Sequence, residues 1–514
     1  MALLGVQLVI TLIMISIIQK VGPHYSFARW LLCSTGLVRY LYPTDNELRQ
    51  LANVPKEQFK SRKNSRQHEN GKNKSDTFHV PRNLDIQLET AKVSALDVVH
   101  LRYYIEYQWL LDFALYSIFV YIATELYHSR FPQKHEVNLS MMWCMLVIIF
   151  ALKLLISLTV QYFKGEESEG ERSTCIVTGF VYLLISMVIL IVDENVLELG
   201  LEKAYSNFNE STIAFLHKQG LDSSGLISKL FFKFFLAISC GVLGGLFTFP
   251  GLRIAKMHWD LLRYFKERKT VQLLLNISFV LPFILVILWI KPVSRNYLTV
   301  RKFSNFQEPL LDSHTFESIR LVAVISTMVI KLMLTPWYLQ AYLDMAYHRI
   351  EEQKKEAGRI TNIDLQKRVA AVFYYLCVAT LQYVIPLIIC LNLIFMYKTL
   401  GGFSWNGILN DEECAVNSKP YEYVSNDEKS SQTILESAQE FHVTVESLKS
   451  VFNETVFRGL FGFATWWCCF LYFATTSVGM VYQSSFACNF QLIYYKRWLK
   501  HPLLVLILEL LILV

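Results

Sequence analysis

Charged residues are scarce in this sequence. Asp, Glu, Lys and Arg make up 18% of its 514 residues, whereas soluble domains carry about 25%. Hydrophobic residues make up 53% and aromatic residues 14%. Several apolar runs reach about twenty residues, the length that spans the hydrocarbon core of a bilayer. The shortage of charge argues against a soluble domain, and the long apolar runs predict a membrane protein.

The sequence also lacks the motifs that indicate an enzyme or a bound metal. None of the patterns GxxxxGK[ST], HExxH and GxSxG occurs, so the chain has no signature of a nucleotidase, a zinc protease or a serine hydrolase. The ten cysteines are scattered, without a CxxC pair or a Cys/His ligand spacing, which argues against zinc. We expect no enzyme activity, no cofactor and no metal, and no nucleic acid or identifiable small-molecule substrate as a partner.

Signatures of known ion pathways are missing too. A voltage sensor carries repeated basic residues on one helix, and a potassium filter has a TVGYG-type sequence; neither is present. No internal repeat is evident, which weakens the case for an inverted-repeat transporter.

What the chain does have is about nine apolar segments, predicted to be transmembrane helices because backbone groups inside a bilayer must bond to one another. The first lacks a basic start and an A-x-A cleavage site, so we expect a retained helix; a cleaved signal peptide is the alternative. The expected spans are residues 2–19, 108–127, 139–163, 174–192, 229–250, 271–290, 317–335, 370–397 and 457–482.

The loops between these spans differ in charge. Segments 20–107, 251–270 and 336–369 are rich in Lys and Arg, which favours the cytosol under the positive-inside rule. The glycosylation sequons at Asn138, Asn209 and Asn453 all fall in the opposite set of loops. Both signals predict an N-terminus outside and basic loops in the cytosol. If residues 1–19 were cleaved, every later loop would change sides.

We therefore divide the chain into a first helix (1–19), a basic polar cytosolic segment (20–107), a helix bundle (108–482) and a C-terminal tail (483–514). Residues 56–74 are predicted to be disordered, and the apolar stretch 501–514 to lie at the interface or to insert partly.

Two cytosolic stretches have helical apolar spacing beside basic residues, namely 252–268 and 337–350. Both are predicted to be amphipathic helices in the headgroup region or, alternatively, helices packed on the bundle. Gly241 and Gly245 form a GxxxG pattern, which predicts close helix packing.

Charged residues inside the spans are the candidate functional residues. Arg320 and Lys331 are eleven residues apart on one predicted helix and therefore share a face, about 16 Å apart. Arg320 is predicted to reach the outer headgroups, and Glu125 has a compatible outer depth. Lys331 is predicted to lie in the inner half of its span.

Asp112 and Lys153 lie at depths compatible with Lys331. Lys153 is near the middle of its span, where an ammonium group is costly and a buried partner is the economical explanation. We predict a polar seam of Asp112, Lys153 and Lys331. Such a seam can carry function or fix helix register, and the sequence leaves both open.

The sequence resembles the transmembrane protein 161 family. The likeness extends from the first span to about residue 405, more weakly to 482, and is lost after about residue 485. Arg320 and Lys331 match basic positions of the family, and Asp112 lies in one of its motifs. The matching stretches are GVQLVITL (5–12), PHYSFARWLLC (23–33), EYQWLLDF (106–113), LELGLE (197–202), TFPGLR (248–253), LQAYL (339–343), EAGRI (356–360), VFYYLCVATLQYVIPL (372–387) and KTLGGFSW (398–405).

The resemblance implies control of potassium and calcium currents, and of rhythm in excitable cells, at the plasma membrane; an endomembrane location is the alternative. It supplies no catalytic or ligand-binding residues. The hypothesis is an all-α polytopic integral membrane protein that modulates cation currents through contact with ion-channel proteins in the lipid bilayer. The alternatives are a channel or transporter lined by the predicted seam, and a structural or trafficking component.

Overall fold

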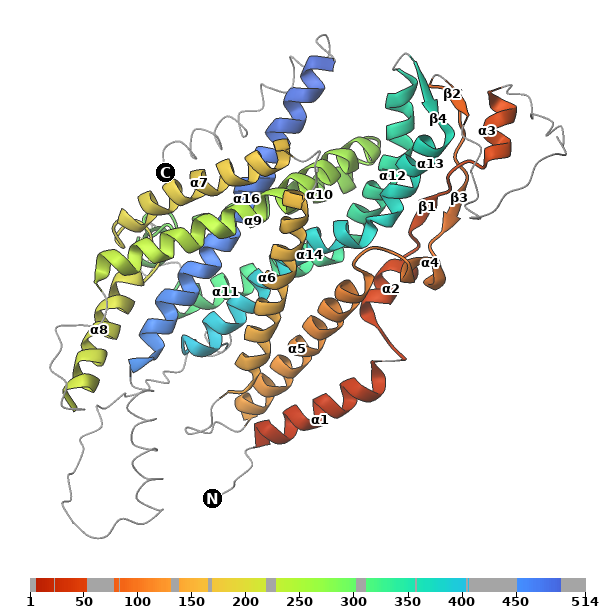
Figure 1. Ribbon diagram of the computed structural model, residues 1–514. Helices are drawn as coiled ribbons and strands as arrows, with labels where there is room; N and C mark the ends of the chain where they lie inside the picture. The colour runs from red at the N-terminus through yellow and green to blue at the C-terminus, as the bar shows by residue number, and fades with distance from the viewer. Residues whose placement is uncertain are drawn as a thin grey trace, which may run out of the picture.

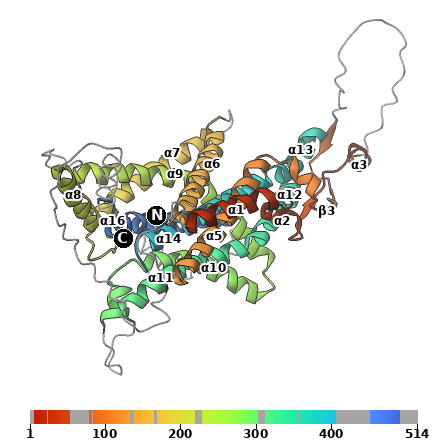
Figure 2. The same ribbon diagram turned by 90° about the horizontal axis from the view of Figure 1, so that it is seen from below.

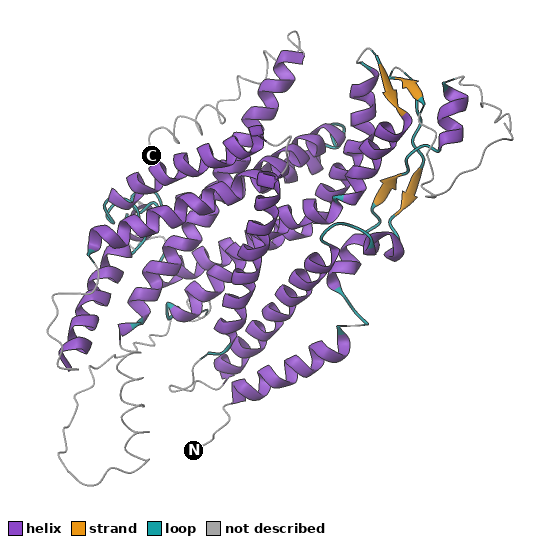
Figure 3. Cartoon of the chain, in the orientation of Figure 1, coloured by secondary structure: helices purple, strands orange, loops and turns teal. Residues whose placement is uncertain are grey.

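The protein is a bundle of long helices with two small sheets beyond one end (Figures 1 and 3). The structure is a computed structural model. It describes residues 6–22, 24–52, 78–82, 84–130, 138–164, 169–218, 228–301, 311–355, 358–403, 405 and 451–490. The predicted disordered stretch 56–74 and the apolar stretch 501–514 lie outside the described residues.

Long helices make up most of the described chain, and short helices and strands connect them. The long helices are α1 (Val6–Val21), α5 (Tyr104–Arg130), α6 (Ser140–Lys164), α7 (Glu169–Ile191), α8 (Leu201–Lys218), α9 (Lys229–Tyr264), α10 (Lys269–Ile287), α11 (Ser313–Met333), α12 (Thr335–Lys354), α13 (Asn362–Tyr374), α14 (Leu376–Leu400) and α16 (Glu454–Phe490). The short elements are α2 (Phe27–Cys33), α3 (Asp45–Leu51), α4 (Ala95–Val99), the π-helical turn η1 (Asn296–Val300), β1 (Val38–Tyr40), β2 (His79–Pro81), β3 (Thr90–Lys92) and β4 (Arg359–Thr361).

The predicted all-α membrane architecture is confirmed, but the count of nine spans is not. Seven helices of the described residues are long and apolar enough to cross a bilayer, and an eighth span results if α11 and α12, which meet at a bend of 42°, count as one. The remaining predicted span corresponds to α1, which has 16 residues. At 1.5 Å per residue this is about 24 Å, shorter than a ~30 Å hydrocarbon core.

Helix α9 decides between the two alternatives predicted for residues 252–268, in favour of packing on the bundle. Residues 252–268 do not begin a separate interfacial helix, because α9 runs without interruption through Pro250 to Tyr264. Ile254, Met257 and Leu261 are buried, so the extension packs on the bundle. Gly241 lies close to α7: a Cβ there would be 2.8 Å from Leu183 Cβ. The packing role predicted for the GxxxG pattern is therefore confirmed.

Helix α14 forms the centre of the bundle. Every residue from Leu376 to Lys398 is buried, and α5, α6, α9, α11, α12 and α16 contact it. Because its surface is apolar all round, burial on every side is the stable arrangement.

The bundle has two ends, which we name after residues of α14. At the Tyr375 end, where α14 begins, lie α12, α13 and the antiparallel pairs β1–β3 and β2–β4, seen together at one side of Figure 2. The face of α12 predicted from sequence is buried, including Leu339, Leu343 and Ile350.

At the Tyr397 end, where α14 finishes, α5 ends and α9, α11 and α16 begin, as contacts such as Arg320–Tyr397 and Arg458–Gly401 show. The described residues of the three sequon loops lie at this end, and those of the basic segments lie at the other. The sequence-based division of the loops agrees with this arrangement, and the side that faces the cytosol stays a prediction.

Candidate functional site

The strongest concentration of buried charge lies at the Tyr397 end, around Arg320. Asp312 caps α11 by accepting a hydrogen bond from the His314 amide (3.2 Å), which places Arg320 in the second turn of the helix. Trp289 follows the end of α10, and α14 brings Tyr397 to the same place. Glu198 arrives on the loop before α8, which turns at Gly200 with a φ of 69°.

Arg320 does not reach the outer headgroups, as the sequence had suggested; its side chain is 2% exposed. The guanidinium pairs with Glu317, and Nη2 donates to the Tyr397 hydroxyl at 2.9 Å. It also lies 4.7 Å from the Trp289 ring centroid. The carboxylate and the aromatic face offset the loss of hydration, so burial is favoured over an extended path to the interface.

A second arginine completes this network. Arg295 pairs with Glu198, approaches Glu317 at 3.5 Å, and donates to the Ser313 hydroxyl at 2.6 Å. Glu198 also lies 3.8 Å from Nη1 of Arg320. Two arginines and two glutamates thus balance one another in charge. We call Arg295, Arg320, Glu198 and Glu317 the arginine network.

A hollow of about 810 Å³ opens beside the arginine network. Its walls carry both signs of charge, from residues that include Asp193, Lys203, Lys291, His314 and Arg458. A hollow of this size can hold a small polar molecule.

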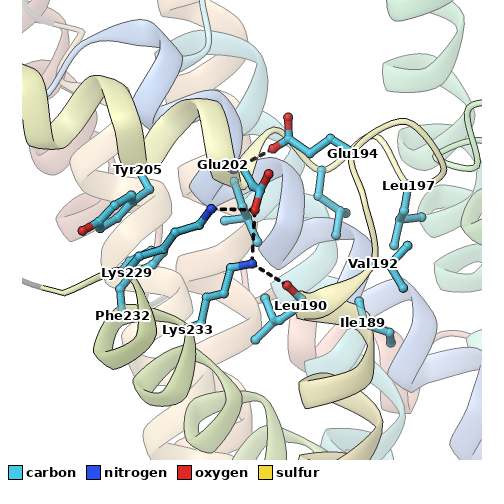
Figure 4. Close-up of a pocket in the computed structure, with 12 residues that line it drawn as sticks. Ile189, Leu190, Val192, Glu194, Leu197, Glu202, Tyr205, Lys229, Phe232 and Lys233 are labelled. Carbon is cyan, nitrogen blue, oxygen red and sulfur yellow. Dashed lines mark hydrogen bonds and ion pairs between the residues drawn. The ribbon is translucent and has the colours of Figure 1, made fainter.

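A small neighbouring pocket contains a second set of ion pairs (Figure 4). Glu202 binds Lys229 at 2.9 Å and Lys233 at 3.3 Å, and Lys233 also donates to the Leu190 carbonyl at 2.8 Å. Hydrogen bonds from Lys229 and Lys233 hold the pKa of Glu202 below its ordinary value. The start of α9 is thereby fixed to α8 and to the end of α7.

Glu125 lies at the same end as Arg320, as its depth predicted, but it has its own partners. Its carboxylate pairs with Lys398 and accepts hydrogen bonds from Trp405 Nε1 at 3.0 Å and from the Thr399 hydroxyl at 3.2 Å. These contacts join the ends of α5 and α14.

The predicted seam of Asp112, Lys153 and Lys331 is wrong. Asp112 accepts hydrogen bonds from the Ser26 hydroxyl (2.7 Å) and the Ala28 amide (3.0 Å), and so fixes the start of α2 on α5. Lys331 is buried, and its Nζ lies 4.9 Å from the centroid of the Tyr472 ring. The three side chains have different surroundings, and no hydrogen bond or ion pair joins any two of them within the described part of the chain.

Lys153 differs most from the prediction, because its side chain is exposed on the outside of the bundle. It lies on an outward stripe of α6 with Ile149 (48% exposed), Ile156 (48%) and Val160 (41%). No hydrogen bond or ion pair joins Lys153 to another described residue.

Comparison with known families shows which family the chain belongs to. The family described as predicted transmembrane protein 161AB matches residues 2–487. The chain belongs to this family. Membership establishes an integral membrane protein of lipid bilayers. No solved structure matches the chain.

The three sequons of this 161AB-family chain lie in different local structures. Asn138 accepts a hydrogen bond from the Ser140 amide at the start of α6, Asn209 lies within α8, and Asn453 accepts one from the Val456 amide at the start of α16. Their glycosylation stays a prediction.

Sequence reasoning missed the partners of Arg320 and Glu125. Glu317 could have been found, because residues three apart on a helix are neighbours. Glu198 and Tyr397 reach Arg320, and Lys398 reaches Glu125, from distant segments of the chain. Only the packing of α5, α11, α14 and the loop before α8 brings them together. Among the described residues no group of three His, Cys, Asp or Glu side chains could hold a metal ion.

Proposed function

We propose that this 161AB-family protein is a non-enzymatic membrane protein that modulates potassium or calcium currents at the plasma membrane through direct contact with a channel. The observation that supports the proposal is the exposed Lys153 on α6. The contact surface is the outward stripe of α6, and the partner is a transmembrane helix that carries an acidic side chain.

Because Lys153 lies near the middle of α6, an acidic partner would lower the free energy of its charged side chain in the bilayer. Lys153 is thirteen residues after Ser140 and eleven before Lys164, about 20 Å and about 17 Å of helix respectively. A cation at the centre of a bilayer costs about 2.5–3.5 kcal/mol on the insertion scale. A carboxylate on a neighbouring helix offsets that cost, and the apolar side chains around Lys153 supply a surface for packing.

A channel or transporter is the second candidate, because the hollow beside the arginine network could be the mouth of a pathway. Beyond that mouth the centre of the bundle is packed: α14 is buried on all sides, and Trp289 and Tyr397 are stacked around Arg320. This packing favours the modulator over the pathway.

Whole-cell recording tests the proposal. Cells without endogenous voltage-gated current would express the chain alone, and then together with a potassium or calcium channel, while both proteins are counted at the surface. The modulator gives no current alone and changes the current per surface channel. A new current from the chain alone would overturn it in favour of the channel, and a change only in channel number would point to trafficking.

Variants of α6 make this test specific. Lys153→Met should abolish the change in current per surface channel, and Lys153→Arg should preserve it. Lys164→Met is the matched control, because it removes a cation from the same helix at its end, where water reaches the side chain. Equal effects of Lys153→Met and Lys164→Met would contradict a role for the central cation.

A further inference from the structure

A basic pocket lies at the Tyr375 end of the bundle. None of its lining residues belongs to α6, so the pocket is separate from the proposed channel contact at Lys153. It has a volume of about 500 Å³ and is formed by β2, β4, α12 and α13. Its basic residues are His79, Arg82, Arg349, Arg359, Lys367 and Arg368, and the one acidic residue of its lining is Asp364. We call this site the basic pocket.

The fold assembles the basic pocket from distant segments. Strand β2 pairs antiparallel with β4, which places Val80 opposite Ile360. Asn362 fixes the same junction: its amide donates to the Phe78 carbonyl at 3.0 Å, and its side-chain oxygen accepts from the Phe78 amide at 3.2 Å. Two buried side chains, Val80 and Ile360, anchor the sheet below the pocket.

Helix α13 presents two of the cations because of its amphipathic pattern. Leu365 and Val369 are buried against the bundle, whereas Lys367 and Arg368 between them are exposed. Arg349 is exposed on α12 and Arg359 on β4. These four cations therefore face a common space without being covered.

Four cations of the basic pocket have no carboxylate partner among the described residues. Asp364 accepts a hydrogen bond at 2.6 Å from the hydroxyl of Thr361, the residue that caps α13. None of Arg349, Arg359, Lys367 and Arg368 has a carboxylate within ion-pair distance among the residues that the structure describes. Several uncompensated cations at such close quarters repel one another, and a multiply charged anion relieves that repulsion.

The basic pocket also lies at a suitable height above the bilayer. Helix α13 leads through Tyr375 directly into the apolar helix α14. Tyr374 is 45% and Tyr375 36% exposed, and tyrosines of this kind sit at the headgroup level. Lys367 precedes Leu376 by nine residues, about 13 Å of helix. With the tyrosines at the headgroup level, this distance places Lys367 within reach of phosphates carried further out on a headgroup.

We propose that the basic pocket binds the phosphorylated headgroup of an anionic phospholipid, of the phosphoinositide type. The phosphomonoesters contact Arg349, Arg359, Lys367 and Arg368, and the acyl chains lie beside the exposed Tyr374 and Tyr375. Basic clusters next to a transmembrane helix are typical of such lipid sites. The ligand chemistry is a cluster of phosphomonoesters, which a soluble inositol phosphate shares, so the test separates the two sources.

The test uses the full chain purified in neutral detergent. Binding of a short-chain phosphatidylinositol bisphosphate is compared with that of soluble inositol trisphosphate and of phosphatidylserine. We expect the bisphosphate lipid to bind most tightly, and the double variant Lys367→Gln/Arg368→Gln to weaken it by on the order of tenfold or more. The variant Lys367→Arg/Arg368→Lys should retain binding.

The matched control is Lys266→Gln/Lys269→Gln, which removes two exposed cations at the same end and should leave binding unchanged. Thermal unfolding of each variant verifies that it is folded. If soluble inositol trisphosphate binds as tightly as the bisphosphate lipid, and the pocket variant loses this binding, the phosphate site is supported and its ligand is a soluble one. Equal affinity for phosphatidylserine, or equal losses in the pocket and control variants, would overturn the proposal.

Discussion

At the Tyr397 end, Arg295, Arg320 and Lys398 each face a carboxylate, whereas at the Tyr375 end the basic pocket collects its cations around a single aspartate. In the first arrangement each cation is paired with a carboxylate of the same chain, and these ion pairs hold α5, α8, α11 and α14 together. The second leaves Arg349, Arg359, Lys367 and Arg368 without a carboxylate partner among the residues that the structure describes. The comparison separates charge that stabilises the fold from charge that is available to a ligand, and the predictions below test the stabilising charges.

The largest effect should come from breaking the arginine network. Arg320→Met leaves Glu317 without its closest partner and Glu198 with Arg295 alone. Removing one member of a buried ion pair costs about 3–5 kcal/mol, so we expect the free energy of unfolding to fall by that amount. Unfolding in mixed micelles, followed by tryptophan fluorescence, measures it.

The double variant Arg320→Met/Glu317→Leu sharpens this prediction. It removes both charges of the closest pair, so a large part of the lost stability should return. Additive losses in the double variant would show that the two residues act independently.

Breaking the ion pair between Glu125 and Lys398, at the end of α5, should have a smaller effect on the free energy of unfolding. Lys398→Met leaves Glu125 with hydrogen bonds from Trp405 and Thr399, which still satisfy part of its carboxylate. We expect a loss of about 1–3 kcal/mol, measured by the same unfolding assay. A loss as large as that of Arg320→Met would contradict the ranking of the two clusters.

Lys331 provides a contrast with Arg320 on the same helix. Its ammonium lies against the Tyr472 ring and pairs with no carboxylate among the described residues, so Lys331→Met leaves no carboxylate without a partner. Replacing a buried charge by an apolar side chain of similar length is then expected to keep or raise stability. Destabilisation beyond about 1 kcal/mol would instead indicate a structural role for the ammonium.

The smallest effect is the acid dependence contributed by Glu202. Its pKa is lower in the folded protein than its ordinary value of 4.5 because Lys229 and Lys233 donate to it. At pH values near and below 4.5 the unfolded chain therefore binds more protons, and stability falls as the pH decreases. Glu202→Gln should make the loss of stability between about pH 5 and pH 3 shallower. An unchanged slope of stability against pH would show that Glu202 does not contribute to the acid dependence.

The sequence predicted what depends on pattern along one helix. The apolar runs located the helices, loop charges and sequons sorted the loops between two ends, and helical spacing identified the buried face of α12. It failed where a contact depends on which neighbouring helix a side chain faces. Lys153, Asp112 and Lys331 were given compatible depths, but a depth does not say which neighbour a side chain faces.

The arginine network shows the same limit. Arg320 was singled out, yet its burial depends on Glu198, Trp289 and Tyr397, which come from three other segments. The basic pocket also escaped prediction, because the pairing of β2 with β4 joins residues about 280 positions apart.

The central claim is that Lys153 faces a channel partner in the bilayer, and site-specific photocrosslinking tests it most directly. A photoreactive side chain at Ile156, next to Lys153 on the outward stripe, would be activated in cells that co-express the chain and a channel whose current it changes. Leu273 on α10, which is 62% exposed, is the control position. The account predicts an adduct with the channel from Ile156 but not from Leu273, lost with Lys153→Met and kept with Lys153→Arg. Adducts with lipid alone, or channel adducts that persist in Lys153→Met, would contradict it.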